Sequence, residues 1–253
     1  MLQAGTHDME PFFPLTTSGS LADIAPQHAF TTRALRFRDE TADADWAELS
    51  RRLDTPADRI VRVAQVHGRK VLVIDQTLSP WRAMEGHGVQ ADSIVCTDLD
   101  LAIAVRVADC VPILIADKSH RVVAAVHAGW RGVACRAVEA GVERLKSLAR
   151  ERLDLVAAIG PHISLASFEV SEEVANVLRE ASPEPNVVDW SRARPHVDLR
   201  RIVRAQLASL GLPEAAIDDV PGCTVLDETR FFSFRRDGKA SGRLLSAIVP
   251  RAG

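Results

Sequence analysis

Two histidines and one cysteine have side chains that could bind a metal ion. Each follows a short apolar, mostly β-branched run, and each has a glycine or proline close after it. In α/β sheets, side chains at such strand ends point into a crevice. The three residues are His67, Cys110 and His127. Two imidazoles and a thiolate form a three-ligand set for Zn²⁺ that leaves a fourth position for water or substrate, and an open zinc site lowers the pKa of bound water to about 7.

The same residues allow two other interpretations. Cys110 could be the nucleophile of a hydrolase, with His127 as the base that activates it. A lone cysteine in an apolar segment is commonly a packing residue, and a histidine at a strand end is commonly a hydrogen-bonded structural residue. The long spacing between the three residues does not distinguish among metal site, nucleophile and packing.

Short apolar segments and Pro-free segments alternate along the chain and define the elements that must position these residues. The apolar segments predict strands, mostly buried on both faces: 60–66, 71–74, 94–95, 101–107, 111–115, 122–126, 155–159 and 244–249. Helical patterns, one capped by a serine and one closed by a glycine, predict helices at 43–53, 132–150, 171–180 and 197–210, with a loop at 183–195. Strands mixed with several long helices indicate an α/β fold with a mixed sheet.

The sequence of 253 residues predicts one domain. We expect an irregular, Pro-containing lead-in at 1–27 and a single domain at 28–253, with no internal repeat or low-complexity segment. The composition is globular, with 47% hydrophobic and 26% charged residues.

Charge and residue counts exclude several classes of protein. A net charge of -3 gives no basic footprint for nucleic acid. No apolar run approaches the roughly 18 residues of a membrane helix. Four cysteines without a C-x-x-C pair and no signal peptide favour a reducing cytoplasm. Tyr is absent and the eight His are dispersed, which excludes a multidomain copper oxidase.

Eight segments, in order, resemble one protein family. They are Gln65–Gly68, Ala91–Val95, Ala108–Pro112, Val126–Gly132, Ile159–Pro161, Phe168–Val170, Phe231–Gly238 and Ser241–Arg243. The most specific are Ala-Asp-Cys-x-Pro and His-Ala-Gly-Trp-Arg-Gly. The chain, from about residue 28 onward, is similar to the multicopper polyphenol oxidoreductase laccase-like proteins, which are also called purine nucleoside phosphorylases and peptidoglycan editing factors.

The resemblance implies a single α/β/α layered domain with a mixed sheet, similar to cysteine-dependent deamidase folds. It implies that His67, Cys110 and His127 bind a metal, generally zinc, with copper as the alternative, and form the active site. The activities it implies are phosphorolysis of adenosine, inosine and methylthioadenosine, and deamination of adenosine. Editing of a peptidoglycan precursor and copper-dependent phenol oxidation are the alternatives. The expected partners are a nucleoside and inorganic phosphate, and the expected state is a monomer or small homo-oligomer.

Phosphorolysis requires groups that bind phosphate, and arginine matches its oxygens bidentately. Arg33, Arg131 and Arg243 lie on matching segments, and we favour Arg131 because it stands at a predicted helix start. Arg235 and Arg236 are weaker candidates. Asp109 could contact the purine leaving group, but we favour it as the partner that orients a ligand imidazole.

The chain departs from the family pattern at three places. After Arg33, the usual Gly-Gly-Val-Ser stretch and the loop behind it are replaced by 34–40, which could alter substrate preference. His162 stands where cysteine is common, either as an extra ligand or, as we favour, as a hydrogen-bonded loop residue. Phe234 replaces the usual tyrosine, so a hydroxyl there cannot be essential in this chain.

Overall fold

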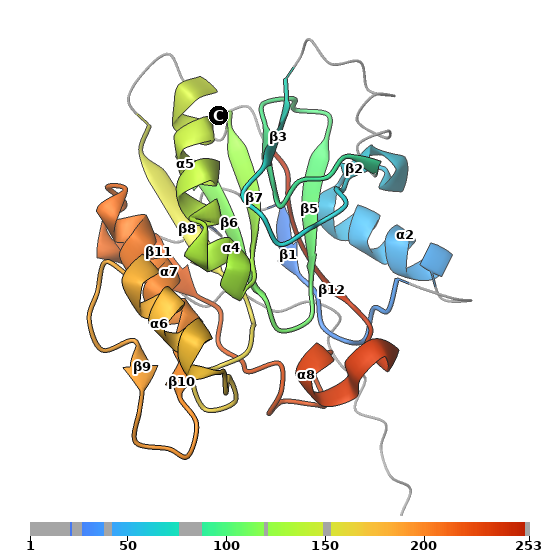
Figure 1. Ribbon diagram of the computed structural model, residues 1–253. Coiled ribbons are helices and arrows are strands. Elements are labelled where there is room, and N and C mark those ends of the chain that lie inside the picture. The colour runs from blue at the N-terminus through green and yellow to red at the C-terminus, as the bar shows by residue number, and fades with distance from the viewer. Residues whose placement is uncertain are drawn as a thin grey trace, which may run out of the picture.

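Two packed β-sheets form the centre of the protein, as the computed structural model shows (Figure 1). The structure describes residues 21, 27–37, 42–75, 88–118, 121–148 and 153–250. Most of the predicted lead-in and residues 38–40 of the divergent segment after Arg33 therefore lie outside the described residues. None of the described helices is long and apolar enough to cross a membrane.

The larger sheet has six strands in the order β11-β8-β6-β7-β4-β3. Its strands are β3 (Val71–Ile74), β4 (Ser93–Cys96), β6 (Val111–Asp117), β7 (Val123–Ala128), β8 (Leu155–Ile159) and β11 (Ile217–Asp219). The β3–β4 and β8–β11 pairs are parallel and the other pairs are antiparallel, so the sheet is mixed, as predicted.

The smaller sheet has four strands in the order β1-β12-β5-β2. They are β1 (His28–Phe30), β2 (Ile60–Val61), β5 (Ala102–Val107) and β12 (Leu244–Ile248). A separate two-stranded ribbon pairs β9 (Val188–Asp189) with β10 (His196–Val197), inside and just after the segment predicted to be a loop. The single sheet expected from the sequence is therefore a double layer.

Helices cover both outer faces of the double sheet (Figure 1). The six-stranded sheet packs on α4 (Trp130–Ala134), α5 (Ala137–Leu148), α6 (Glu172–Ala181) and α7 (Leu199–Ser209), and the four-stranded sheet packs on α2 (Ala42–Leu53). The described residues also form a short helix, α8 (Phe234–Asp237), and the 3-10 turns η2 (Ala57–Arg59), η4 (Glu214–Ala216) and η5 (Gly238–Ala240). The mixed α/β class is confirmed.

Alternation along β6 shows why its residues are apolar without interruption. Ile113 and Ile115 pack in the core on the helix side, whereas Leu114 and Ala116 pack in the core between the two sheets. Successive side chains of a strand point to opposite faces, so a strand between two apolar layers needs apolar residues at every position.

The structure differs from two predicted boundaries for local reasons. The helix predicted at 132–150 is divided between α4 and α5, because the backbone reverses at Arg136, whose φ is 63°. The strand predicted at 60–66 ends at Val61. Beyond it, Ala64 forms a single parallel bridge with Gln90, and the N–H groups of residues 66–68 bind a buried carboxylate in place of a neighbouring strand.

Gly160, just after β8, lets the two sheets approach closely. A Cβ at this position would lie 2.4 Å from two ring carbons of Phe30 and 2.8 Å from Pro112 Cγ. Phe30 is a fully buried member of the core between the sheets, so neither neighbour can move without loss of packing.

We expect Gly160→Ala to lower the free energy of unfolding by about 1–3 kcal/mol, the usual cost of overpacking a core. Gly88→Ala is the matched control, since a Cβ there meets nothing within 4 Å. Urea titrations of both variants check the difference. Equal stability of Gly160→Ala and the parent protein would show that the sheets are not in tight contact at this point.

Candidate metal centre and active-site pocket

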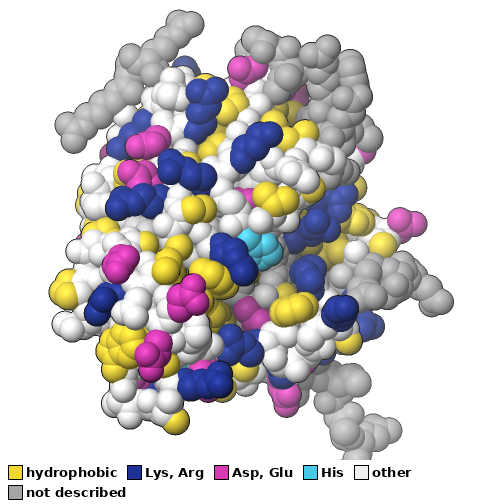
Figure 2. Space-filling model, viewed as in Figure 1, with side chains coloured by type: hydrophobic (Ala, Val, Ile, Leu, Met, Phe, Trp, Pro, Cys, Tyr) yellow, Lys and Arg dark blue, Asp and Glu magenta, His cyan; other side chains and the backbone are white. Residues whose placement is uncertain are grey.

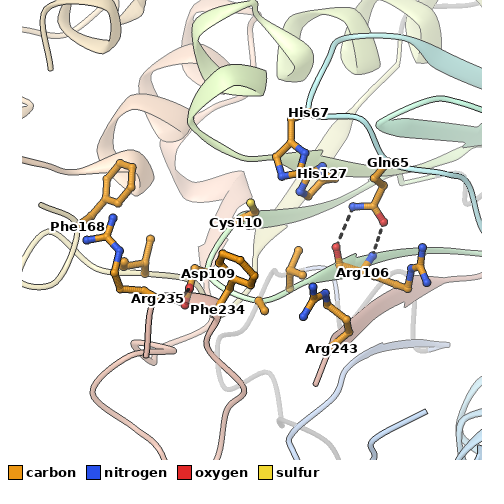
Figure 3. Close-up of a pocket in the computed structure, with 13 residues that line it drawn as sticks. Gln65, His67, Arg106, Asp109, Cys110, His127, Phe168, Phe234, Arg235 and Arg243 are labelled. Carbon is orange, nitrogen blue, oxygen red and sulfur yellow. Dashed lines mark hydrogen bonds between the residues drawn. The ribbon is translucent and has the colours of Figure 1, made fainter. Parts of the chain in front are cut away.

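The three residues predicted to form a metal site converge at one end of the six-stranded sheet (Figure 3). The ligand atoms of His67, Cys110 and His127 all lie within 4.8 Å of one another. Cys110 immediately precedes β6, His127 lies on the neighbouring β7, and the two strands pair in register from Val111 opposite Ala128. His67 comes from the loop after β2, and its ring is 4.9 Å from that of His127 at an angle of 79°.

The backbone adopts a left-handed conformation at two residues of this site. His67 has a φ of 61° and Asp109, just before Cys110, has a φ of 89°. Residues with a Cβ rarely adopt such angles, and surrounding contacts must hold them there. Strained backbone of this kind clusters at functional sites.

The carboxylate of Asp92 holds the backbone of His67 and the ring of His127. It is fully buried and accepts hydrogen bonds from the backbone N–H groups of His67 at 2.8 Å and Gly68 at 2.7 Å. It also bonds to His127 Nδ1 at 2.9 Å, which leaves Nε2 as the nitrogen available to a metal. Burial alone would raise the pKa of the Asp92 carboxyl, but the hydrogen bonds from His127 and Gly68 outweigh burial and lower it.

Asp109 has a different role from the one favoured by its place in the sequence. Its Oδ1 accepts a hydrogen bond of 2.6 Å from Thr224 Oγ1, and its Oδ2 accepts one of 2.6 Å from the Arg235 backbone N–H. Both oxygens therefore tie the start of α8 and the residue 224 loop to the site. The imidazole partner is Asp92, which has its own place in the matching segment Ala91–Val95.

Gly129 allows the cysteine and His67 to meet. A Cβ on Gly129 would lie 2.8 Å from Cys110 Sγ and 3.0 Å from His67 Cδ2. The glycine in the His-Ala-Gly-Trp segment is thus required by close approach to two ligand side chains.

Charges at the site favour a thiolate beside an imidazolium when no metal is bound. Burial would raise the pKa of the Cys110 thiol, but hydrogen bonds with His127 and His67 outweigh burial and lower it to about 7. Burial would lower the pKa of His127, but the hydrogen bonds with Asp92 and Cys110 raise it to about 9. A bound metal would replace these protons.

A cavity of about 540 Å³ opens above the three residues. Its size is typical of a pocket for a small organic ligand. Apolar groups, cations and one carboxylate line it: Gln65, His67, Arg106, Val107, Ala108, Asp109, Cys110, His127, Ile163, Phe168, Phe234, Arg235 and Arg243. Figure 2 shows a histidine side chain exposed at the surface between Lys or Arg side chains.

Arg243 is the one favoured phosphate-binding arginine that lines this pocket. Arg131 is exposed, and its guanidinium carbon lies 4.3 Å from the centre of the Trp130 ring. Arg33 donates to the Glu228 carbonyl and lies 5.3 Å from the centre of the Phe232 ring. The structure does not bring either of these two arginines into the pocket lining.

His162 is a hydrogen-bonded loop residue, the alternative we favoured. Its Nδ1 lies 2.7 Å from the Gly160 carbonyl oxygen, and burial lowers the pKa of its ring. It does not join the cluster of metal-ligating atoms found among the described residues.

Three residues that the sequence does not single out, or ranks as weaker candidates, line the pocket: Gln65, Arg106 and Arg235. Gln65 and Arg106 hold each other across the pocket edge: the Gln65 amide donates to the Arg106 carbonyl, and Gln65 Oε1 accepts from the Arg106 backbone N–H, both at 2.8 Å. Gln65 has a signal in the sequence, its place two residues before His67 in the matching segment. The signal for Arg106 is that it is the one charged residue in an otherwise apolar strand. Arg235 faces the pocket while Arg236 pairs with Asp237.

The donor set fits a metal with one open position. One thiolate and two imidazoles match zinc, whose bonds of about 2.0–2.3 Å would draw the three atoms slightly together. Asp92 orients one imidazole in the way that supporting carboxylates do in metal sites. The pocket side of the cluster stays open to a ligand. Copper shares the preference for imidazole and thiolate, so the donor set alone does not choose between the two metals.

Fold and site together define a mixed α/β protein with one His₂Cys centre in a cationic pocket. The family described as multi-copper polyphenol oxidoreductase laccase matches residues 33–251, and the chain belongs to this family. The resemblance seen in the sequence is thereby confirmed.

Two of the chain's relatives have names that refer to nucleosides. A purine nucleoside phosphorylase of Bacteroides thetaiotaomicron is 35% identical over 200 residues, which cover 76% of this chain and 73% of the relative. Adenosine deaminase RL5, from an unknown prokaryotic organism, is 35% identical over 208 residues, covering 79% and 78%. The crystal structure of YlmD from Geobacillus stearothermophilus is 26% identical, with a TM-score of 0.78 over 88% of this chain and 91% of that one.

We expect Asp92→Asn to weaken metal binding by about 10–100-fold, the usual cost of losing a partner that supports a ligand. An amide cannot accept all the N–H groups that the carboxylate holds, so both histidines lose their positions. Metal-chelator competition measures the affinity. The control is Asp117→Asn, since Asp117 is also a buried carboxylate but lies on β6. An equal loss of metal affinity in both variants would contradict the role assigned to Asp92.

Proposed function

We propose that the protein is a zinc-dependent purine nucleoside phosphorylase that acts on adenosine, inosine and methylthioadenosine. The observation that carries this proposal is the open His₂Cys set at the floor of a cavity lined by three arginines. The names of the relatives support the same class of substrate. A cavity with cations and aromatic rings suits a purine nucleoside together with inorganic phosphate.

Arg243 and Arg106 are the residues that we assign to inorganic phosphate. Arg106 lies on β5, and Arg243 immediately precedes the neighbouring strand β12, in which Leu244 is opposite Val107 and Leu245 is opposite Arg106. Neither forms an ion pair among the described residues, so their guanidinium groups can donate to phosphate oxygens. The bound phosphate would then attack C1′ of the ribose as positive charge develops on the sugar.

Phe234 and Phe168 supply apolar faces for the purine and ribose. Phe168 is buried in the pocket wall, whereas Phe234 is 49% exposed at the mouth. An exposed aromatic ring at a pocket mouth gains by stacking on a flat base. This assignment needs no hydroxyl at position 234, in agreement with the phenylalanine found there.

When zinc is bound at His67, Cys110 and His127, it supplies Lewis acidity at its open position. The protein holds the groups around that position in place, with His127 fixed by Asp92 and the start of α8 fixed by Asp109. Zinc chemistry is also used by enzymes that deaminate adenine, so we propose adenosine deamination as a side activity of the same pocket.

A cysteine hydrolase is the second candidate, and the lowered pKa of Cys110 favours it. A thiol with a pKa of about 7 beside two imidazoles is an activated nucleophile. Such an enzyme could act as an amidase on a cell-wall precursor, and it would work without metal. Phenol oxidation ranks last, because one His₂Cys centre among the described residues cannot store the four electrons that reduction of O₂ to water requires.

We expect Cys110→Ala and removal of metal by a chelator each to reduce phosphate-dependent release of hypoxanthine or adenine more than about a hundredfold, since even loss of an outer partner costs about 10–100-fold. Liquid chromatography of the released base measures the activity. Cys135→Ala is the control, because the Cys135 thiol contacts the Gly132 carbonyl and belongs neither to the metal-ligating cluster nor to the pocket lining. Full activity of metal-free protein would contradict the zinc proposal, and a covalent Cys110 adduct formed during turnover would favour the hydrolase.

We expect Arg243→Ala to raise the KM for phosphate about 10–100-fold, the value of a charge-assisted hydrogen bond, with a smaller effect on the KM for the nucleoside. Initial rates at varied phosphate concentration measure this. Arg131→Ala tests the position that the sequence favoured. If Arg131→Ala raised the KM for phosphate and Arg243→Ala did not, the assignment from the pocket would be wrong.

A further inference from the structure

Cationic groups at the pocket occupy two separate positions. Arg106 lies on β5 and Arg243 immediately precedes the adjacent strand β12, whereas Arg235 lies in the first turn of α8 beside Phe168. Figure 3 shows Phe234 between Arg235 on one side and Arg243 on the other, with Cys110 above. A single phosphate at Arg106 and Arg243 would therefore leave Arg235 without an anionic partner.

Arginines elsewhere in the described chain commonly pair with carboxylates. Examples are Arg51 with Glu48, Arg192 with Asp189, Arg201 with Glu184, and Arg204 with Glu214 and Asp219. The three pocket arginines form no ion pair with any residue that the structure describes. Asp109, the one carboxylate of the lining, already accepts a hydrogen bond at each oxygen. The pocket thus carries an excess of positive charge that its own residues do not neutralise.

Arg235 is held in place in advance of any ligand. Its guanidinium donates to the carbonyl oxygens of Ser167 at 3.4 Å and Glu169 at 3.1 Å, and it lies 5.7 Å from the centre of the Phe168 ring. Five N–H donors are present in a guanidinium, so donors remain for an anion. A fixed guanidinium loses little conformational entropy when it binds one.

We propose that the second anion is part of the substrate: the pocket takes purine nucleoside 5′-monophosphates, with Arg235 binding the 5′-phosphoryl group. This inference rests on the proposed phosphorolysis and adds a substrate class to it. A phosphomonoester carries a charge of about −1.5 to −2 at neutral pH, enough to balance a second cationic position. Phe234, between the two positions, would then contact the nucleoside that joins them.

The reaction follows the same bond changes as phosphorolysis of a nucleoside. An oxygen of inorganic phosphate forms a bond to C1′ while the C1′–N9 bond breaks. The bonding electron pair goes to N9 of the purine, and the purine gains one proton, which balances the proton that hydrogen phosphate loses when it forms the ester. The 5′-phosphoryl group is unchanged, so the products are the free base and ribose 1,5-bisphosphate.

The test compares adenosine with adenosine 5′-monophosphate on the full chain loaded with zinc. We expect phosphate-dependent release of adenine from both, with ribose 1,5-bisphosphate identified by mass spectrometry. Arg235→Ala should lower kcat/KM for the nucleotide about 10–100-fold relative to adenosine. Arg235→Lys, which keeps the charge and loses the planar fork, should be intermediate. Arg179 is an exposed arginine in the last turn of α6, and Arg179→Ala should leave kcat/KM unchanged for both substrates.

Calorimetric binding to Cys110→Ala protein separates this inference from the proposed function. In one outcome, the parent protein fails to cleave adenosine, while Cys110→Ala protein binds the nucleotide more tightly than adenosine and loses this preference when Arg235 is also replaced by alanine. In that case the proposed phosphorolysis is wrong, and recognition of the phosphoryl group by Arg235 is supported. If adenosine is cleaved and the nucleotide is not, the substrate claim is overturned, whether or not the nucleotide binds. Equal loss for both substrates in Arg235→Ala would also overturn it, because Arg235 would then act on a group that the two share.

Discussion

The buried carboxylate of Asp92 is the interaction on which the site depends. A single anion inside the protein captures the backbone of the 66–68 turn and the ring of His127, and so brings a loop and a strand to one point. Burying a charge is costly unless hydrogen bonds satisfy it, and here every bond that satisfies the carboxylate comes from a candidate ligand residue or its immediate neighbour. The same contacts hold the left-handed backbone of His67.

The cluster of His67, Cys110 and His127 could be predicted from the sequence because each of them follows a recognisable apolar strand and precedes a turn. Most strands and the helix at 42–53 were equally predictable, since burial on one or both faces leaves a periodic pattern. The second sheet was not, because β1 and β2 have three and two residues and their pairing is nonlocal. Arg106 and the partner of His127 could not be assigned from local sequence, because their roles depend on strand register.

Electrostatic layering relates the fold to its chemistry. Asp92 lies beneath the histidines, the thiol and imidazoles lie at the floor of the cavity, and arginines lie at its walls, so negative charge is held inside and positive charge faces the ligand. That order suits an anionic ligand. The family name refers to several coppers, whereas the described residues form one cluster of metal-ligating atoms. Asp109, the residue before Cys110, accepts a hydrogen bond from the Arg235 backbone N–H and so anchors α8, which carries both Phe234 and Arg235, next to the cysteine.

X-ray absorption at the zinc edge of the purified protein tests the central claim most directly. An open His₂Cys zinc centre predicts one sulfur neighbour at about 2.3 Å, two nitrogen neighbours at about 2.0–2.1 Å and one further light atom. The sulfur signal should disappear in Cys110→Ala. A zinc ion without a sulfur neighbour, or a protein that contains copper in place of zinc, would contradict the account.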